Sequence, residues 1–218
     1  MRGVLRWGNA MSETLPRNVI DAADINAITQ LILRERESRD LARWETMREC
    51  YWPDSLVRVS WFRGNGPDFV TGSIEMARRG IPAKHRLAAI LVRLAGVRAL
   101  ASMHGIIDLP VTMKGVSATL STHSRFLYRA EKRDARWGLM GFDAIYMRDE
   151  LIPDLPGQTI SIDPAEVEDF RKSYRLLSYY LHSQGYKVDS SLAGEDRPET
   201  ATMLYQELFT WAGVDVPK

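Results

Sequence analysis

The chain has few of the features that tie a protein to a membrane, a nucleic acid or an oxidising compartment. Its 218 residues include one cysteine, Cys50, so no disulfide can form within the chain. No apolar run approaches the roughly 18 residues that would span a bilayer. The 29 lysine and arginine residues nearly cancel 28 aspartate and glutamate residues, and the net charge of +1 gives no field that attracts nucleic acid or acidic lipid. We therefore expect a cytoplasmic protein that binds neither.

Motifs for common cofactors are also missing. The glycine-containing segment RGNGPD lacks the lysine–serine pattern of a phosphate-binding loop. There is no Gly-x-Ser-x-Gly elbow, and no histidine or acidic pair has the tight spacing of a metal motif. We expect no cofactor and no metal. The start of the chain lacks the apolar region of a signal peptide. Met11 is an alternative start to Met1, and we expect residues 1–18 to form a disordered or weakly docked extension.

Helical periodicity dominates the first quarter of the chain. Ile25, Ile28 and Ile32 recur at helical spacing, which predicts an amphipathic helix ending near Asp40. The charged residues of its second half are predicted to lie on the solvent face: Arg34, Glu35, Arg36, Glu37 and Arg39. A second, short helix is predicted to end at Pro53, and a third to cover residues 68–79.

Strand-like runs follow the helices. They are predicted over residues 56–62, 83–94, 97–112, 116–131 and 137–148. Glycine or aspartate in the breaks between the last four runs suits tight hairpins. Helices followed by a long antiparallel meander indicate an α+β protein. Strands of about ten residues suggest a strongly curved sheet that wraps around the helices.

The pattern changes after Pro153. A capping box, Asp163-Pro164-Ala165-Glu166, predicts the start of one helix, and a second helix is predicted to end at Gly213. The length and composition fit one domain with an appendage, which we place at residues 19–153 and 154–218. The aromatic side chains of the appendage must be buried on the domain or against a second subunit. We expect a homodimer.

Two histidines on neighbouring predicted strands, His85 and His104, follow an aspartate, Asp40, that closes the first helix. A carboxylate and two imidazoles suffice for proton transfer near neutral pH. If Ala95-Gly96 is a two-residue hairpin turn, both histidines lie on one face of the sheet as diagonal neighbours. A three-residue turn would put them on opposite faces, so this prediction depends on the register.

Three segments resemble the SnoaL-like branch of the nuclear transport factor 2-like superfamily, and in particular its scytalone dehydratase-like members. They are RESRDLARWETMRECYWPDSLVRVSW, PAKHRLAAILVRLAGVRALASMHG and STHSRFLYRAEKRDARWGLMGFDAIYMRDELIP. The resemblance covers roughly residues 22–153. It implies a cone-shaped, cystatin-like fold in which N-terminal helices pack on a curved antiparallel sheet, with the C-terminal two-helix extension as a departure.

The resemblance also implies catalytic residues. AKHRLA and SMHGII match the places where these relatives carry two cavity histidines, so His85 and His104 are carried over. RDLARW matches the place of an aspartate that fixes the tautomer of the first histidine, so Asp40 is carried over. A buried carboxylate in that position also stabilises the imidazolium once it forms.

Four further residues are placed by the resemblance. Thr122 and Ser124 fall where the relatives hold short polar residues against the substrate. Arg39 and Trp61 stand where the relatives have two tyrosines that hold a water on a substrate carbonyl. Arginine can polarise an oxygen but does not replace a tyrosine hydroxyl. This departure favours a different substrate.

An apolar pocket is predicted inside the curved sheet. Alternation on the last strand predicts that Met140 and Phe142 face inward, whereas His123 and Arg125 are predicted on the convex face. The other predicted lining residues are Tyr51, Trp61, Phe69 and Met103. A pocket lined by methionine and aromatic side chains suits a flat or cyclic hydrophobic ligand.

These observations predict a small-molecule enzyme, a lyase or isomerase, acting on a hydrophobic cyclic or aromatic substrate. His85 would be the general base, Asp40 its orienting partner, and His104 a second polar contact or acid. A non-catalytic binding or assembly module of the same fold, such as an accessory subunit, is the alternative. Structural roles also stay open, because Asp40 can pair with Arg36 or cap the next helix, and either histidine can be a surface or core residue.

Overall fold

The computed structural model describes residues 17–215. Of the extension predicted at residues 1–18, residues 1–16 lie outside the described residues, whereas residues 17 and 18 belong to the first helix. Three helices precede most of the strands: α1 (Arg17–Asp40), α2 (Trp44–Glu49) and α3 (Gly66–Arg78). The strands are β1 (Tyr51–Val59), β2 (Phe62–Gly64), β3 (Lys84–Leu87), β4 (Leu91–Ala95), β5 (Arg98–Met113), β6 (Val116–Arg133) and β7 (Arg136–Pro153). Within residues 17–215, no helix is both long enough and apolar enough to cross a bilayer.

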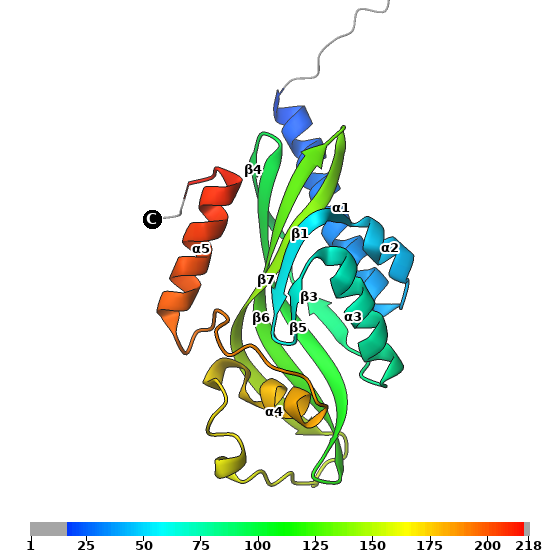
Figure 1. Cartoon of the computed structure of the whole chain (residues 1–218), viewed down its shortest axis with the longest axis vertical. Coiled ribbons are helices and arrows are strands. Elements are labelled where there is room, and N and C mark those ends of the chain that lie inside the picture. Colours follow the sequence, from blue (N-terminus) through cyan, green and yellow to red (C-terminus); the bar gives the residue numbers. More distant parts are fainter. Residues whose placement is uncertain (1–16, 216–218) are drawn as a thin grey trace, which may run out of the picture.

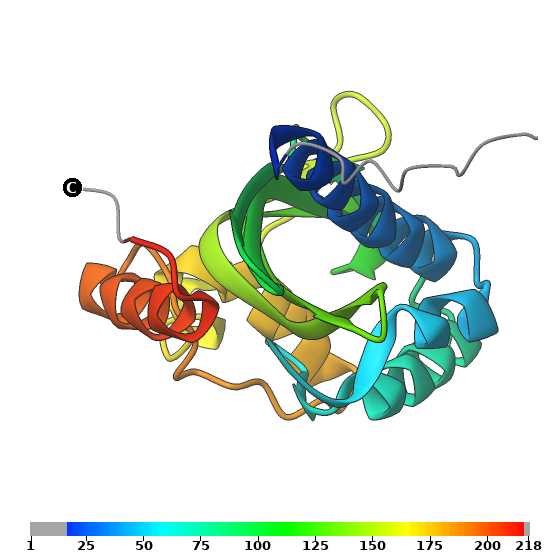
Figure 2. The same cartoon turned by 90° about the horizontal axis from the view of Figure 1, so that it is seen from above.

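The strands form one curved sheet in the order β2-β1-β7-β6-β5-β3, and β4 also pairs with β5. All pairings are antiparallel except that of β1 with β7, which is parallel. Figure 2 shows the sheet as an open arch, with α1, α2 and α3 on its concave side. The α+β fold with N-terminal helices on a curved sheet is therefore confirmed, with the parallel β1–β7 pair as an addition.

An interruption between β3 and β4 changes the register of the sheet edge. Leu94 lies opposite Ala99, whereas His85 lies opposite Ile107. The residues between the two strands, 88–90, thus shift the pairing by one position. Because a one-residue shift reverses the face of every side chain, His85 points to the concave side and His104 to the convex side. The prediction that the two histidines share one face is wrong for this reason.

The C-terminal extension covers both sides of the sheet. Its first part is less helical than predicted, with two short 3₁₀ turns, η1 (Pro164–Glu166) and η2 (Lys172–Tyr174), before α4 (Arg175–Ser183). The last helix, α5 (Pro198–Ala212), ends at Gly213 in a left-handed conformation with φ of +69°, as the sequence predicts. Figure 1 shows α4 at one end of the arch and α5 alongside the sheet.

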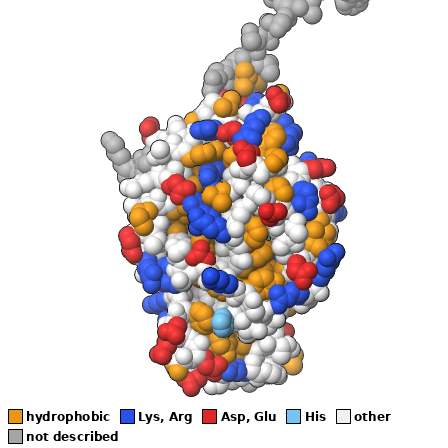
Figure 3. Space-filling model, viewed as in Figure 1, with side chains coloured by type: hydrophobic (Ala, Val, Ile, Leu, Met, Phe, Trp, Pro, Cys, Tyr) orange, Lys and Arg blue, Asp and Glu red, His pale blue; other side chains and the backbone are white. Residues whose placement is uncertain are grey.

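Two apolar clusters hold these layers together. The larger fills the space between the sheet and α1, α3 and α4, with Ile28 and Phe126 fully buried. The smaller joins α5 to the convex face through Leu100, Leu127 and Leu208. Charged groups of both signs are interspersed over the outer surface drawn in Figure 3. The convex face is thus partly buried by the chain's own last helix.

The lack of a side chain at Gly105 leaves room for the Phe126 ring to lie over it, on the concave face near His85. A Cβ built on Gly105 would lie 2.2 Å from the Phe126 ring, and the Phe126 and His85 ring centroids are 6.2 Å apart. We expect Gly105→Ala to destabilise the protein by about 1–3 kcal/mol, because the ring must move within a packed core. Urea unfolding measures the change.

Thr112→Ala, at an exposed position of the same strand, is the matched control and is expected to change stability by about 0.5 kcal/mol or less. Equal stability of Gly105→Ala and the wild-type protein would contradict this packing.

Candidate functional site

Three hydrogen bonds join the end of α1 to strand β3. The Nδ1 atom of His85 lies 2.5 Å from the Oδ1 atom of Asp40, and the backbone N–H of His85 donates to Asp40 Oδ2 at 2.8 Å. The Lys84 ammonium donates to the last carbonyl of the helix, that of Asp40. The carboxylate therefore fixes both the strand and the imidazole. The structure brings Asp40 and His85 together, and Asp40 pairs with neither Arg36 nor the next helix.

The partners of His85 define its tautomer. A guanidinium can only donate, and Arg36 Nη1 lies 3.3 Å from His85 Nε2. Nε2 is therefore the acceptor, and Nδ1 carries the proton that it donates to Asp40. The His85 side chain is only 4% exposed and that of Asp40 18%. This is the arrangement of a general base held in its proton-accepting form.

Burial also adjusts the proton affinity of this pair. Burial lowers the pKa of His85 below its usual value, and the charges of Arg36 and Arg39 act in the same direction, while the bond to Asp40 offsets part of the effect. Burial alone would raise the pKa of Asp40, but its hydrogen bonds with His85 outweigh burial and lower it. At neutral pH the pair is thus a carboxylate and a neutral imidazole.

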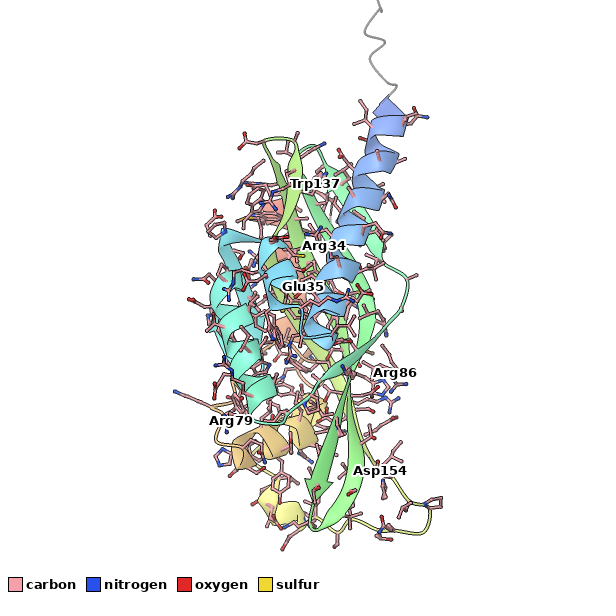
Figure 4. The ribbon with its side chains drawn as sticks, turned by 90° about the vertical axis from the view of Figure 1, so that its right-hand side faces the viewer. Arg34, Glu35, Arg79, Arg86, Trp137 and Asp154 are labelled. Atoms are coloured by element: carbon pink, nitrogen blue, oxygen red, sulfur yellow. The ribbon has the colours of Figure 1, made fainter. Side chains whose placement is uncertain are left out.

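A buried ion pair lies next to the dyad. Glu35 accepts hydrogen bonds from the Nε and Nη2 atoms of Arg36, and both side chains are almost fully buried. The Tyr51 hydroxyl donates to Glu35 at 2.9 Å, and that of Tyr128 lies 3.4 Å from it. Figure 4 shows Glu35 between α1 and the strands. This network fixes the guanidinium that faces His85.

Five charged residues in the second half of α1 were predicted to lie on its solvent face, and for three of them that prediction is wrong. Glu35, Arg36 and Arg39 are 0%, 2% and 5% exposed. They continue the buried stripe of Ile28 and Ile32 at helical spacing. Counting from Ile28, these three residues lie seven, eight and eleven positions further along, on the same helix face, and this spacing was the signal for their burial. Charged residues, however, normally lie on the opposite, solvent-exposed face.

Arg36 and Arg39 bring two positive charges to the cavity. Burial alone would lower the pKa of Arg36, but the Glu35 carboxylate outweighs burial and raises it. Burial and the Arg36 charge lower the pKa of Arg39 to about 10, which still leaves it protonated at neutral pH. Within residues 17–215 Arg39 makes no ion pair; its guanidinium lies 3.6 Å from Met76 Sδ and 5.6 Å from the Trp44 ring centre.

The cavity beside the dyad has a volume of about 50 Å³. His85, Arg36 and Arg39 form its polar wall, and the rest of the lining is largely apolar. Three of the predicted lining residues are present: Trp61, Phe69 and Phe142. Helix α4 contributes Leu177 and Leu181, so the C-terminal extension forms part of the wall.

Three predicted lining residues lie elsewhere. Tyr51 is buried against Glu35, and Met103 is buried in the core without lining the cavity. A β-bulge shifts the β6–β7 register between Arg129 and Ala130, which reverses the facing of the residues before it. Met140 consequently contacts Arg133 Nη2, at 3.1 Å from its sulfur. The prediction that these three residues line the cavity is wrong.

Thr122 and Ser124 face the concave side but are fully packed, at 0% and 1% exposure, and do not line the cavity. Thr122 lies opposite Asp149, which the sequence did not single out. Asp149 Oδ2 accepts the backbone N–H groups of Leu176 and Leu177 at 2.8 and 3.0 Å. Burial raises the pKa of Asp149 to about 6, although these N–H groups oppose the shift. Asp149 thus anchors the start of α4.

His104 lies outside the site. Its Nε2 atom accepts a hydrogen bond from Arg125 at 2.7 Å on the exposed convex face, so the prediction that it reaches the cavity is wrong. His123 and Arg125 lie on the convex side with it.

Within residues 17–215 no three His, Cys, Asp or Glu side chains are grouped to hold a metal ion. Burial raises the pKa of the Cys50 thiol to about 11, which disfavours the nucleophilic thiolate.

The geometry defines a class of protein: an α+β fold whose curved sheet encloses a small cavity with an Asp–His pair in its wall. Residues 21–140 match the model of the SnoaL-like domain. This chain belongs to the SnoaL-like family. It is also 27% identical over 188 residues to an uncharacterized protein of Emericella nidulans, covering 79% of each chain. It is 27% identical over 177 residues to an uncharacterized protein of Aspergillus terreus, covering 73% of this chain and 65% of that protein.

Solved structures share the fold at low identity. A protein of Novosphingobium aromaticivorans assigned as a scytalone dehydratase superposes with a TM-score of 0.52 and 13% identity, over 66% of this chain and 95% of that one. The hexachlorocyclohexane dehydrochlorinase of Novosphingobium barchaimii gives a TM-score of 0.55 and 13% identity, over 67% and 99%. These similarities establish the architecture. The site residues come from this chain's own geometry.

The buried network predicts a pH response of His85 that needs no substrate. Because burial lowers the pKa of its imidazole, we expect the His85 ring to titrate below the usual 6.5 and to carry its proton on Nδ1 at neutral pH. The folded state then binds this proton less tightly than the unfolded chain. The contribution of His85 to stability is therefore present above pH ~6.5 and is lost as the pH falls through its folded pKa.

Nitrogen-15 NMR of the histidine rings, with His85→Gln used to assign the resonance, measures both the midpoint and the tautomer. A midpoint above 6.5, or a proton on Nε2 at neutral pH, would contradict this environment of His85.

The Glu35–Arg36 pair predicts a large difference between two neighbouring acidic residues. Glu35→Gln leaves Arg36 buried without its counter-ion, so we expect a loss of about 3–5 kcal/mol in the free energy of unfolding. Glu37→Gln removes only an exposed pair with Arg43 at 3.6 Å, and we expect a loss below about 1 kcal/mol. Urea unfolding compares the two variants, and equal losses would refute the buried ion pair.

Proposed function

We propose that this protein is a small-molecule lyase or isomerase in which His85 acts as the general base. The observation that carries the proposal is the His85 imidazole, which donates from Nδ1 to Asp40 and lines the cavity. Its Nε2 atom accepts from Arg36 Nη1 at 3.3 Å, so substrate must displace this contact before Nε2 can accept a proton. Asp40 orients the ring and stabilises the imidazolium that forms when Nε2 accepts a proton. Such an arrangement contributes about 10²–10⁴-fold to a proton-transfer rate.

The two arginines supply the complementary charge. When His85 takes a proton from a carbon or oxygen of the substrate, negative charge develops on the substrate or on its leaving group. The Arg36 and Arg39 guanidiniums line the same cavity and stabilise that charge in a largely water-free environment. Arg39, which has no ion pair of its own within the described residues, is the cation better placed to bind an anionic group. Asp40 also lines an open groove between α1 and β3, through which the proton can be exchanged with solvent.

The names of two structural neighbours support this reaction class. A dehydratase and a dehydrochlorinase both carry out eliminations by name. Base-promoted elimination or isomerisation needs a proton acceptor and a stabilised anion, and the cavity of this chain offers both. The apolar lining favours a hydrophobic cyclic or aromatic substrate.

The size of the cavity adds a condition. A cavity of about 150 Å³ is needed to hold benzene, whereas this one has about 50 Å³. A ring-sized substrate therefore requires a wall to move. The wall formed by Leu177 and Leu181 belongs to α4, which contacts β6, β7 and η2 and is held at its start by Asp149. We propose that α4 shifts outward when substrate enters.

Our second proposal is a non-catalytic assembly module. Such a module would have a closed core without a cavity at His85. The cavity at His85 favours the enzyme. In either case a homodimer would need a surface other than the part of the convex face that α5 already buries.

A thermal-shift screen of cyclic ketones, phenols and halocarbons first identifies ligands, and an activity assay then shows which of them is turned over. Substitution of Asp40 and His85 tests the proposal with that substrate. We expect His85→Asn and Asp40→Asn each to lower kcat/KM by about 10²–10⁴-fold, because the base or its orientation is lost. We expect Asp40→Asn, which keeps the side-chain volume, to change the Tm by only a few degrees, and His85→Asn, which is smaller, to lower it somewhat further.

His123→Asn is the matched control. His123 lies on the convex face, with Nε2 3.4 Å from Glu150, and this variant is expected to retain full activity. Full turnover by His85→Asn would eliminate the proposed base, and a loss that occurs only together with unfolding would support a structural role instead.

A further inference from the structure

Arg39 of α1 is a buried cation that forms no ion pair with a carboxylate among residues 17–215. The residue is only 5% exposed. Its Nη2 atom lies 3.6 Å from the Met76 sulfur, and its guanidinium carbon lies 5.6 Å from the Trp44 ring centre. A thioether is a weak hydrogen-bond acceptor, and an aromatic ring carries no opposite charge. A buried charge with such partners is costly, and a ligand that pairs with it removes part of that cost.

The carboxylates closest to Arg39 along the helix are already engaged by other groups. Glu35 accepts from Arg36, and Asp40 accepts from the backbone N–H and the ring of His85. Burial and the Arg36 charge lower the pKa of Arg39 to about 10, although Asp40 and Glu35 oppose the shift at longer range. Arg39 is therefore protonated at neutral pH, and within the described residues only one of its N–H groups has an acceptor.

The cavity at His85 has two positive charges in its lining and no negative one. Among the described residues, Arg36 and Arg39 are the charged side chains that line it, whereas Glu35 and Asp40 do not. One water molecule needs about 10–15 Å³ of such a volume. The cavity of about 50 Å³ therefore has room for a carboxylate group in its present shape.

The guanidinium and its surroundings favour a carboxylate over other anions. A planar guanidinium binds a carboxylate through two parallel hydrogen bonds. One negative charge matches the one unpaired cation, since the Arg36 charge is already held by Glu35. A phosphate dianion would bring a second negative charge without a partner. The remainder of the lining is largely apolar, so it suits a hydrocarbon group attached to the carboxylate.

We propose that the substrate is a hydrophobic cyclic or aromatic carboxylic acid whose carboxylate binds Arg39. This inference rests on the proposed function and adds the substrate class to it. Arg39 holds the acid so that a C–H bond of the same molecule faces His85, which lines the same cavity. Nε2 takes the proton of that bond, and the electron pair stays on the substrate.

An acid and its neutral amide test this assignment on the wild-type protein. Cyclohexanecarboxylate and cyclohexanecarboxamide have the same ring and nearly the same shape but differ in charge. We expect the acid to bind at least about tenfold more tightly than the amide, because only the acid forms charge-assisted bonds with Arg39. Acetate and acetamide, which need little movement of the cavity wall, should show the same preference at lower affinity. Titrations followed by NMR at the Trp61 indole N–H, in the cavity wall, measure all four affinities.

Two substitutions locate the acid preference. We expect Arg39→Met to bind acid and amide equally and to have a Tm at least as high as the wild-type protein, because an apolar side chain replaces an unpaired buried cation. Arg43→Met is the matched control. Arg43 is exposed and pairs only weakly with Glu37, at 3.6 Å, so this variant should keep the full preference for the acid.

The His85→Asn variant separates this inference from the catalytic proposal. It lacks the base but retains Arg39, so we expect it to prefer the acid over the amide whether or not the protein is an enzyme. Conversely, His85-dependent turnover of a neutral compound by a protein without acid preference would leave the base in place and overturn only the substrate class.

Three further outcomes would overturn the assignment. The first is equal affinity of acid and amide, or no binding of either acid, in the wild-type protein. The second is an acid preference that persists in a folded Arg39→Met variant. The third is loss of the preference in Arg43→Met, which would assign acid binding to the outer surface.

Discussion

The bond between the Glu35 carboxylate and the Arg36 guanidinium is the interaction on which the interior of this protein depends. A lone charge in so buried a position would be strongly destabilising, and the pair is retained because each group satisfies the other. The hydroxyls of Tyr51 and Tyr128 complete the shell around Glu35. This network ties α1 to β1 and β6, and it holds a permanent positive charge against the Nε2 atom of His85.

That positive charge sets the chemistry of the histidine. With Arg36 donating to one ring nitrogen and Asp40 accepting from the other, the neutral ring has a single tautomer. Burial and the neighbouring cations lower its pKa, so the ring is neutral at neutral pH and its Nε2 lone pair accepts the Arg36 hydrogen bond. Asp40 lies at the helix end and bonds both to the backbone and to the ring of His85. One carboxylate thus positions a helix end, an edge strand and the His85 ring.

The C-terminal extension packs on both faces of the sheet, through different interactions on each. On the concave side, Asp149 accepts the first N–H groups of α4 and holds Leu177 against the cavity. On the convex side, α5 buries Leu100 and Leu127. The extension therefore forms part of the cavity wall on one face and covers part of the sheet on the other.

The sequence by itself determined the class of fold, the three long strands β5, β6 and β7 and the Asp40–His85 pair, because hydrophobic periodicity, turn residues and family-matched segments are local signals. It misplaced the end of the second helix, since Pro53 lies inside β1. It did not determine which side His104 faces, since the shift at residues 88–90 alters the register by one position without any distinctive motif. Nor did it reveal Met140 turned away by a β-bulge. Only the tertiary structure decided that Glu35, Arg36 and Arg39 are buried. The free energy of burying a charge depends on partners distant in sequence, here Tyr51, Tyr128 and His85, and no local pattern encodes their meeting.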